Sequence, residues 1–189
     1  MIAGPNGAGK TSAAPDLLRD TVGIEAFVNA DVIAEGLSGF RPESAAFEAG
    51  RILLRRVREL ARDRADFSFE STLAGRSGVR VLSDLAQAGY DVHIFYLWLP
   101  SADMAVARVR RRVEAGGHDV PEQVIRRRFG KSLVNFDTLY CPLASTWRMY
   151  DGSAPGGRPL IAFGQAGNES TIADAARWAT VRKQLKELA

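Results

Sequence analysis

The chain alternates between short strand-like runs and longer segments with helical periodicity. The strand-like runs occupy residues 1–3, 26–31, 66–72, 91–99 and 158–163. The run at 91–99, DVHIFYLWL, is apolar at nearly every position. Such continuous apolar character is typical of a strand that is covered on both faces within a parallel sheet.

Helical segments lie between and after these runs. They occupy residues 10–20, 42–64, 78–90, 101–117, 121–128 and 170–188. The longest of them places Phe47, Leu54, Val57 and Ala61 on one stripe at helical spacing. Pro15 is expected to kink or shorten the first helix, because proline lacks a backbone N–H. Alternating strands and helices predict an α/β fold, a three-layer sandwich with a parallel central sheet.

The composition of the chain is consistent with this fold and limits the number of domains and the location of the protein. A chain of 189 residues suggests a single domain, residues 1–189. No apolar run reaches the roughly 18 residues that a membrane span needs. Cys141 is the single cysteine, which excludes an internal disulfide. Together with the lack of a recognisable leader sequence, this favours a cytoplasmic location.

The stretch AGPNGAGKTS, residues 3–12, contains the strongest chemical signal. Its spacing, G-x-x-x-x-G-K-[ST], is that of a phosphate-binding loop. Glycines let backbone N–H groups converge on an anion, the lysine reaches the β- and γ-phosphates, and the threonine hydroxyl ligates Mg²⁺. The predicted ATP-binding residues are Gly4, Pro5, Asn6, Gly7, Ala8, Gly9, Lys10, Thr11 and Ser12.

Only three residues precede Gly4, the first residue of this motif. A central parallel strand usually needs about five residues. The sequence therefore predicts that a few residues upstream of Met1 belong to the first strand.

The rest of the chain favours one class of phosphate-loop protein. A GTPase would need a D-x-x-G after a later strand, but the only such motif is DTVG at 20–23, and no N-K-x-D is found. A motor ATPase would show paired acids at the end of an apolar strand. A small-molecule kinase needs only the loop, a carboxylate base and arginines that neutralise the transferring phosphoryl group.

Two carboxylates are candidates for the acceptor side of such a site. Asp31 ends the second predicted strand, at the sheet edge where ligands bind in open parallel sheets, and is expected to be the base. The alternative is that it caps the following helix, and an aspartate can do both. Glu70 ends the third strand, where it could bind the acceptor, order the waters of a metal ion, or act only as a cap.

Arginines cluster in the segment 101–130, which we name the arginine lid. Arg108 and Arg112 lie one turn apart on a helix that ends at a glycine pair, and Arg126, Arg127 and Arg128 follow on the next helix. Such a hairpin can close over ATP and exclude water. The alternatives are a solvated helix face or a nucleic-acid patch.

Several stretches together resemble the zeta toxin family of phosphate-loop kinases. They are IAGPNGAGKTS, FVNADVIA, EAGR, FSFESTLAGR, GYDVHIFYLWL, RVRRRVEAGGHDVPEQVIRRRF and WRMYDGS. The resemblance covers residues 2 to about 163, and the N-A-D and E-S-T motifs are its specific part. The chain is similar to the compact members of the family, since it lacks a long C-terminal extension.

The resemblance implies a role for each matching residue. Lys10 and Thr11 would hold ATP and Mg²⁺, Asp31 would deprotonate the acceptor hydroxyl, and Glu70 and Thr72 would contact the acceptor. The arginines that stabilise the transferring phosphate would be Arg112, Arg127 and Arg128. The implied activity is an ATP-dependent kinase of a UDP-sugar, UDP-N-acetylglucosamine first, and the implied partner is a small helical antitoxin.

The sequence leaves other acceptors and other functions open. The acceptor could be another small hydroxylated compound, such as a drug or a nucleotide. The chain could also be an ATP-dependent regulatory or nucleic-acid-binding module, although a nucleic-acid or membrane partner is not expected. The stretch YDGS at 150–153 stands where similar proteins read Y-D-N-S, so a side-chain amide contact is missing at Gly152.

Overall fold

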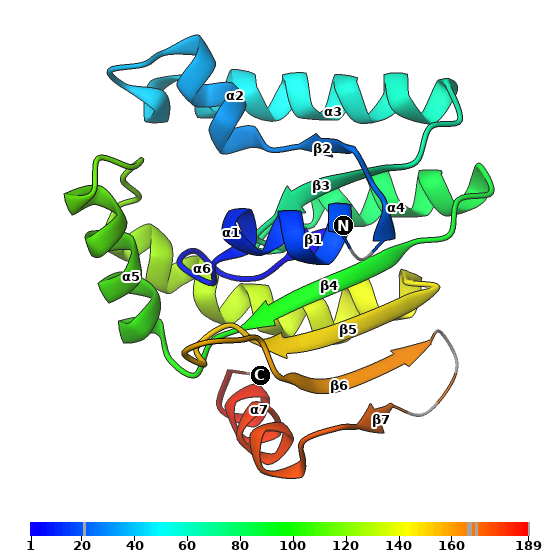
Figure 1. The fold of residues 1–189 in the computed structure, drawn as a ribbon, viewed down its shortest axis with the longest axis vertical. Coiled ribbons are helices and arrows are strands. Elements are labelled where there is room, and N and C mark those ends of the chain that lie inside the picture. Colours follow the sequence, from blue (N-terminus) through cyan, green and yellow to red (C-terminus); the bar gives the residue numbers. More distant parts are fainter. Residues whose placement is uncertain (21, 166–167, 169, 189) are drawn as a thin grey trace.

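The computed structural model describes residues 1–20, 22–165, 168 and 170–188 (Figure 1). Within these residues seven strands form one sheet, in the order β2-β3-β1-β4-β5-β6-β7. The strands are β1 (Ile2–Ala3), β2 (Ala26–Val28), β3 (Phe67–Ser71), β4 (His93–Trp98), β5 (Thr146–Asp151), β6 (Leu160–Gln165) and β7 (Thr171–Ile172). The first five strands pair in parallel, and β6 and β7 are antiparallel.

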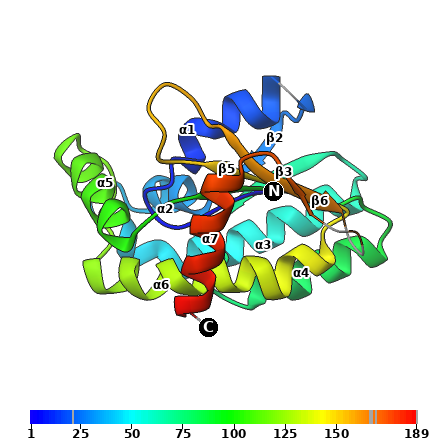
Figure 2. The same cartoon turned by 90° about the horizontal axis from the view of Figure 1, so that it is seen from below.

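Helices cover both faces of this sheet. They are α1 (Lys10–Ala14), α2 (Ala30–Leu37), α3 (Ala46–Arg62), α4 (Ser77–Gln87), α5 (Ala102–Glu114), α6 (Glu122–Asn135) and α7 (Ala175–Leu188). Figure 2 shows α1 on one side of the sheet and α3, α4, α6 and α7 on the other. The predicted three-layer α/β arrangement is therefore confirmed, with a sheet that is parallel in its central part.

Strand β4 contributes side chains to the apolar cores on both faces of the sheet. Ile94 and Tyr96 belong to the apolar core shared with α3, α4, α6 and α7, whereas Phe95 and Leu97 belong to the core under α1 and α5. All four side chains are buried. Burial on both faces is the physical reason for the continuous apolar run that the sequence shows here.

The structure corrects several predicted elements. Pro15 does shorten the first helix, which continues as a π-helix over Pro15–Asp20. The helix predicted to end at Arg128 continues to Asn135, and the closing helix begins only at Ala175, because Thr171–Ile172 pair with β6. The strand β5 is absent from the sequence-based prediction.

The predicted apolar stripe of the long helix is also wrong in part. Helix α3 buries Leu53, Val57 and Leu60 against the sheet and Ala49 against α2, whereas Phe47 is 80% exposed. The buried positions follow the spacing of four, four and three residues that keeps one line on a helix. No helix in the described part of the chain is both long and apolar enough to cross a membrane.

The strand directions locate the functional end of the molecule. In Figure 1 the arrows of β4 and β5 point toward α5, so the carboxyl ends of the parallel strands face the arginine lid. Residues 4–9, between β1 and α1, lie at this same edge. Ligands of open α/β sheets bind at the carboxyl ends of the strands.

Candidate active site

The loop of residues 4–9 has the backbone conformation that its glycines allow. Gly4, Gly7 and Gly9 adopt φ angles of 142°, 77° and 83°. A Cβ atom at Gly4 would lie 2.4 Å from the Leu97 carbonyl oxygen, and one at Gly7 would lie 2.8 Å from that of Ala105. The loop therefore packs directly against β4 and α5, and side chains are excluded at both contacts.

Lys10 and Thr11 meet a single carboxylate at the start of α1. The Lys10 ammonium, 6% exposed, donates to the Pro5 carbonyl oxygen at 3.1 Å and lies 3.5 Å from Glu70 Oε1. The Thr11 hydroxyl donates to Glu70 Oε2 at 2.8 Å. Strand β3 places Glu70 here because it pairs with β1, with Glu70 opposite Ile2.

Asn29 completes this group, and the sequence analysis missed it. Its buried side-chain amide donates to Glu70 Oε2 at 2.9 Å, and more weakly to Thr11 Oγ1 at 3.4 Å. The Asn29 Oδ1 atom accepts the Asp31 backbone N–H at 2.8 Å and so caps α2. A short polar residue directly before a helical segment is the signal that could have revealed it.

Asp31 lies in a helix rather than at the end of a strand. Strand β2 ends at Val28, and Asp31 is the second residue of α2. The alternative prediction that Asp31 caps this helix is wrong, because Asn29 does so. Its carboxylate lies in the first turn of the helix, where the backbone N–H groups favour negative charge.

A cavity of about 950 Å³ joins these groups to the arginine lid. Its lining includes the predicted residues Asn6, Gly7, Gly9, Lys10, Thr11, Ser12, Asp31, Glu70, Thr72, Arg112, Arg127 and Arg128. The loop residues Gly4, Pro5 and Ala8 are buried behind this lining. The fold thus brings both ends of the predicted site, loop and carboxylates on one side and lid arginines on the other, to one space.

The lid arginines differ in how they are held. Arg112 donates to the His118 carbonyl oxygen at 2.8 Å, while Arg112 Nε and His118 Nδ1 are buried without a hydrogen-bond partner among the described residues. Arg127 and Arg128 line the cavity from α6. Arg126 instead pairs with Glu122 at 2.8 Å and with Asp103 at 2.7 Å, outside the cavity lining.

Arg108 lines the same cavity, but backbone carbonyl oxygens hold its guanidinium. Its guanidinium donates to the carbonyl oxygens of Gly152 at 2.6 Å, Ser153 at 3.4 Å and Gly7 at 3.4 Å. A Cβ atom on Gly152 would lie 2.8 Å from the Ala8 carbonyl oxygen. The glycine in YDGS therefore lets the turn after β5 approach the phosphate loop closely.

Sequence comparison assigns most of this region to a known family. The family described as AAA domain, AAA_33, matches residues 1–136, from β1 to just past α6. An uncharacterized protein of Haemophilus influenzae is 29% identical over 129 residues, which are 68% of this chain and 90% of that protein.

Two solved structures share the fold at low sequence identity. AvrRxo1-ORF1, solved in complex with AvrRxo1-ORF2 and with ATP, superposes with a TM-score of 0.71 at 18% identity over 95% of this chain. This chain spans 62% of the length of that protein. A structure of the PezAT toxin–antitoxin system of Streptococcus pneumoniae gives 0.64 at 15% identity, covering 99% of this chain and 86% of that one. These similarities confirm the predicted α/β fold with a mostly parallel central sheet.

Proposed function

Because the chain belongs to the AAA domain family AAA_33, we propose that it is a zeta-toxin-like kinase that transfers the γ-phosphate of ATP to a hydroxyl group of a small molecule. One observation supports this more than any other. A single cavity is lined by the phosphate loop, by Asp31 and by the lid arginines Arg112, Arg127 and Arg128. Phosphoryl transfer needs these three parts and little covalent chemistry from the protein.

The phosphate half of the site is formed by the loop and by Lys10. Backbone N–H groups of a glycine loop at a helix N-terminus bind phosphate oxygens, and the lysine neutralises their charge. Lys10 is already directed into this region by its contacts with Pro5 and Glu70. It would exchange the carboxylate for a phosphate oxygen when nucleotide binds.

The residues present also fit Mg²⁺. The Thr11 hydroxyl and the Glu70 carboxylate, 2.8 Å apart, are hard oxygen donors of the kind that Mg²⁺ prefers. Bound Mg²⁺ would neutralise phosphate charge. We propose that Thr11 ligates it and that Glu70 orders its water ligands, since both Glu70 oxygens contact phosphate-side residues. Asp31 and Thr72 are then the residues that we propose to contact the acceptor.

Asp31 is proposed as the general base. It lines the cavity at the start of α2, and its backbone N–H is fixed by the Asn29 cap. A carboxylate there would accept the proton of the acceptor hydroxyl as that oxygen attacks the phosphorus. From the opposite wall, Arg112, Arg127 and Arg128 would stabilise the charge that spreads over the transferring group.

We propose UDP-N-acetylglucosamine as the first acceptor to test, on the strength of the resemblance to zeta toxins. Purified protein should form ADP from ATP and Mg²⁺ faster when this sugar nucleotide is added. Asp31→Asn should abolish that increment while ATP still binds. If the rate of ADP formation is unaffected by UDP-N-acetylglucosamine but raised by a nucleoside or an aminoglycoside, UDP-N-acetylglucosamine is rejected as the acceptor. That result would retain the assignment as a kinase.

We also propose that the protein acts in the cytoplasm and is neutralised by a small helical antitoxin. The complexes of AvrRxo1-ORF1 with AvrRxo1-ORF2 and of PezAT support such a partner. Expression should then arrest growth, and Lys10→Ala should abolish the arrest. Harmless expression of an active kinase would argue for an enzyme without an antitoxin.

A further inference from the structure

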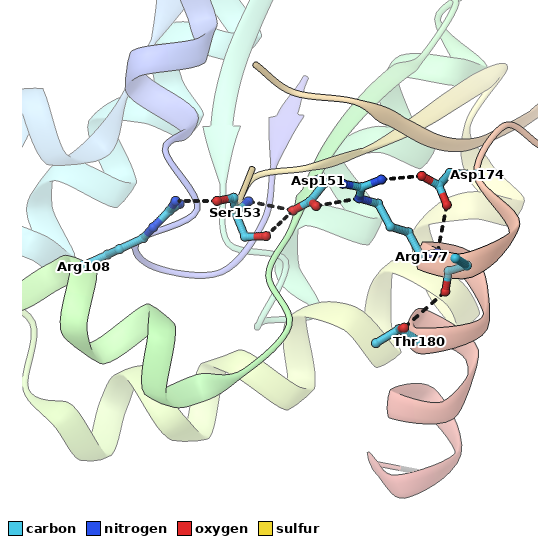
Figure 3. Close-up of polar contacts among 7 residues, drawn as sticks. Arg108, Asp151, Ser153, Asp174, Arg177 and Thr180 are labelled. Atoms are coloured by element: carbon cyan, nitrogen blue, oxygen red, sulfur yellow. Dashed lines mark hydrogen bonds and ion pairs between the residues drawn. The ribbon is translucent and has the colours of Figure 1, made fainter. Parts of the chain in front are cut away.

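A network of polar and charged side chains leads from α7 to Arg108, which lines the cavity beside the phosphate loop (Figure 3). Its centre is Asp151, the last residue of β5, which is only 4% exposed. Asp151 Oδ2 accepts a hydrogen bond from Arg177 Nε at 2.8 Å. Arg177 lies in the first turns of α7 and also pairs with Asp174. The C-terminal helix is therefore tied to the end of a central strand.

The other oxygen of Asp151 organises the turn that follows. Asp151 Oδ1 accepts the Ser153 backbone N–H at 2.7 Å and the Ser153 hydroxyl at 2.5 Å. With Arg177 on its second oxygen, this carboxylate has three hydrogen-bond donors. Charge-assisted bonds of this kind are the stronger ones in proteins, so the turn at 151–153 is well defined.

The ordered turn at 151–153 binds the side chain of Arg108. The carbonyl oxygens of Gly152 and Ser153 accept from the Arg108 guanidinium, which also reaches the carbonyl oxygen of Gly7. Figure 3 shows Arg108 and Arg177 on opposite sides of this turn. One continuous set of hydrogen bonds thus leads from α7, through Asp151, to the phosphate loop.

We propose that Arg177 and Asp151 are positioning residues, which fix Arg108 against the phosphate loop and so set the affinity for ATP. The proposal rests on the proposed function for the identity of the ligand. A loop with three glycines loses much conformational freedom when it binds phosphate, so a loop that is already ordered binds more tightly. Arg108 supplies that order from outside the loop.

The attachment of α7 does not rest on this pair alone. Trp98 Nε1 donates to Gln184 Oε1 at 2.6 Å, and Val181 and Leu185 are buried in the core. A change at Arg177 should therefore leave the helix packed on the sheet. This separates a positioning role from a purely structural one.

The variant Arg177→Gln tests the proposal. We expect the KM for ATP to rise about tenfold, the effect of losing one charge-assisted hydrogen bond in the network. The KM for the acceptor and kcat should change little. Arg177→Lys, which keeps the charge but can serve only one of the two carboxylates well, should fall between the variant and the wild type.

Hydrogen–deuterium exchange of the free protein gives a second measurement that needs no ligand. Arg177→Gln should speed exchange at the backbone amides of residues 6–10 and leave β4 unchanged. Arg182→Gln is the matched control, because Arg182 lies on the same helix and pairs with Asp137 at 3.7 Å, away from the loop. It should change neither exchange at the loop nor the KM for ATP.

The outcomes separate the two proposals. Unchanged exchange at residues 6–10 in Arg177→Gln would overturn the positioning role, whether or not ATP binds. If Arg177→Gln speeds exchange at the loop but the protein binds no ATP, the positioning role is supported and the proposed kinase function is rejected. An equal effect of Arg182→Gln would reduce Arg177 to a general stabiliser of α7.

Discussion

The Thr11 hydroxyl donates a hydrogen bond of 2.8 Å to Glu70 Oε2, across the gap between α1 and β3. The two residues are far apart in sequence and meet because β3 lies beside β1 in the sheet. The resemblance to zeta toxins implied that Glu70 contacts the acceptor. Its contacts with Lys10 and Thr11 favour a role beside the phosphates and Mg²⁺ instead.

A first prediction follows for Glu70. Glu70→Gln keeps the size of the side chain but removes the charge that would order the water ligands of Mg²⁺. We expect the Mg²⁺ concentration for half-maximal activity to rise at least about tenfold, as for other outer-sphere ligands. Titration of activity with Mg²⁺ measures this.

Thr72→Val provides the comparison for Glu70→Gln. It should raise the KM of the acceptor without shifting the requirement for Mg²⁺, since Thr72 lines the cavity and is proposed to contact the acceptor. If Glu70→Gln raises only the KM of the acceptor, Glu70 belongs to the acceptor half and our assignment is wrong.

A second prediction concerns Asn29, which joins the two halves of the site. Asn29→Ala removes both the cap of α2 and the hydrogen bond to Glu70. Loss of an N-cap typically costs about 1 kcal/mol of unfolding free energy. We expect that loss in urea unfolding, together with a lower kcat, because Asp31 would no longer be held in place.

Asn29→Ser separates the two roles of Asn29. A serine can cap the helix but is too short to reach Glu70, so stability should recover while kcat stays low. Recovery of both would show that the cap alone matters.

The sequence predicts those features that depend on neighbouring residues. The phosphate loop is encoded in eight consecutive positions, so Lys10 and Thr11 could be placed before any fold was known. The strand at 91–99 was equally plain, because burial on both faces makes it apolar throughout. The predicted strand that ended at Asp31 is three residues too long, since β2 ends at Val28 and the Asn29 cap and α2 follow directly.

Contacts between distant segments could not be predicted in this way. Arg108 looks like a mobile lid arginine in sequence, yet three backbone carbonyl oxygens hold it. Those carbonyls come from the phosphate loop and from the turn after β5, a strand that the sequence analysis did not find. Strand order and the close approach permitted by Gly152 decide such contacts, and neither leaves a local pattern.

A third prediction tests the corrected face of α3. Leu53→Ala removes a buried side chain and should lower the free energy of unfolding by about 2–5 kcal/mol. Phe47→Ser changes an exposed side chain, so the loss should stay within about 0.5 kcal/mol. Urea unfolding of the two variants measures the difference. A larger loss of unfolding free energy for Phe47→Ser than for Leu53→Ala would favour the buried stripe predicted from the sequence.

The fourth prediction is a dependence of stability on pH that arises from Asp151. Burial raises the pKa of its carboxyl, but the hydrogen bonds from Ser153 and Arg177 outweigh this effect, so the pKa lies below its ordinary value. A carboxyl whose pKa is lowered by folding stabilises the protein above its unfolded pKa, about 3.9. That contribution is lost as the pH falls through the lower, folded value.

Asp151→Asn should therefore be less stable than the wild type by a nearly constant amount between pH 5 and pH 7, as a carboxyl is already about 90% ionised one unit above its pKa. The difference should shrink below about pH 4, because the unfolded wild-type chain then binds a proton at Asp151 that the folded carboxyl, with its lower pKa, still resists. Urea unfolding at a series of pH values measures it, with Asp91→Asn, a change at an exposed carboxylate, as the control. A difference that persists undiminished at pH 3 would mean that Asp151 acts through its shape rather than its charge, and the ion pair with Arg177 would then contribute little to holding the turn beside the phosphate loop.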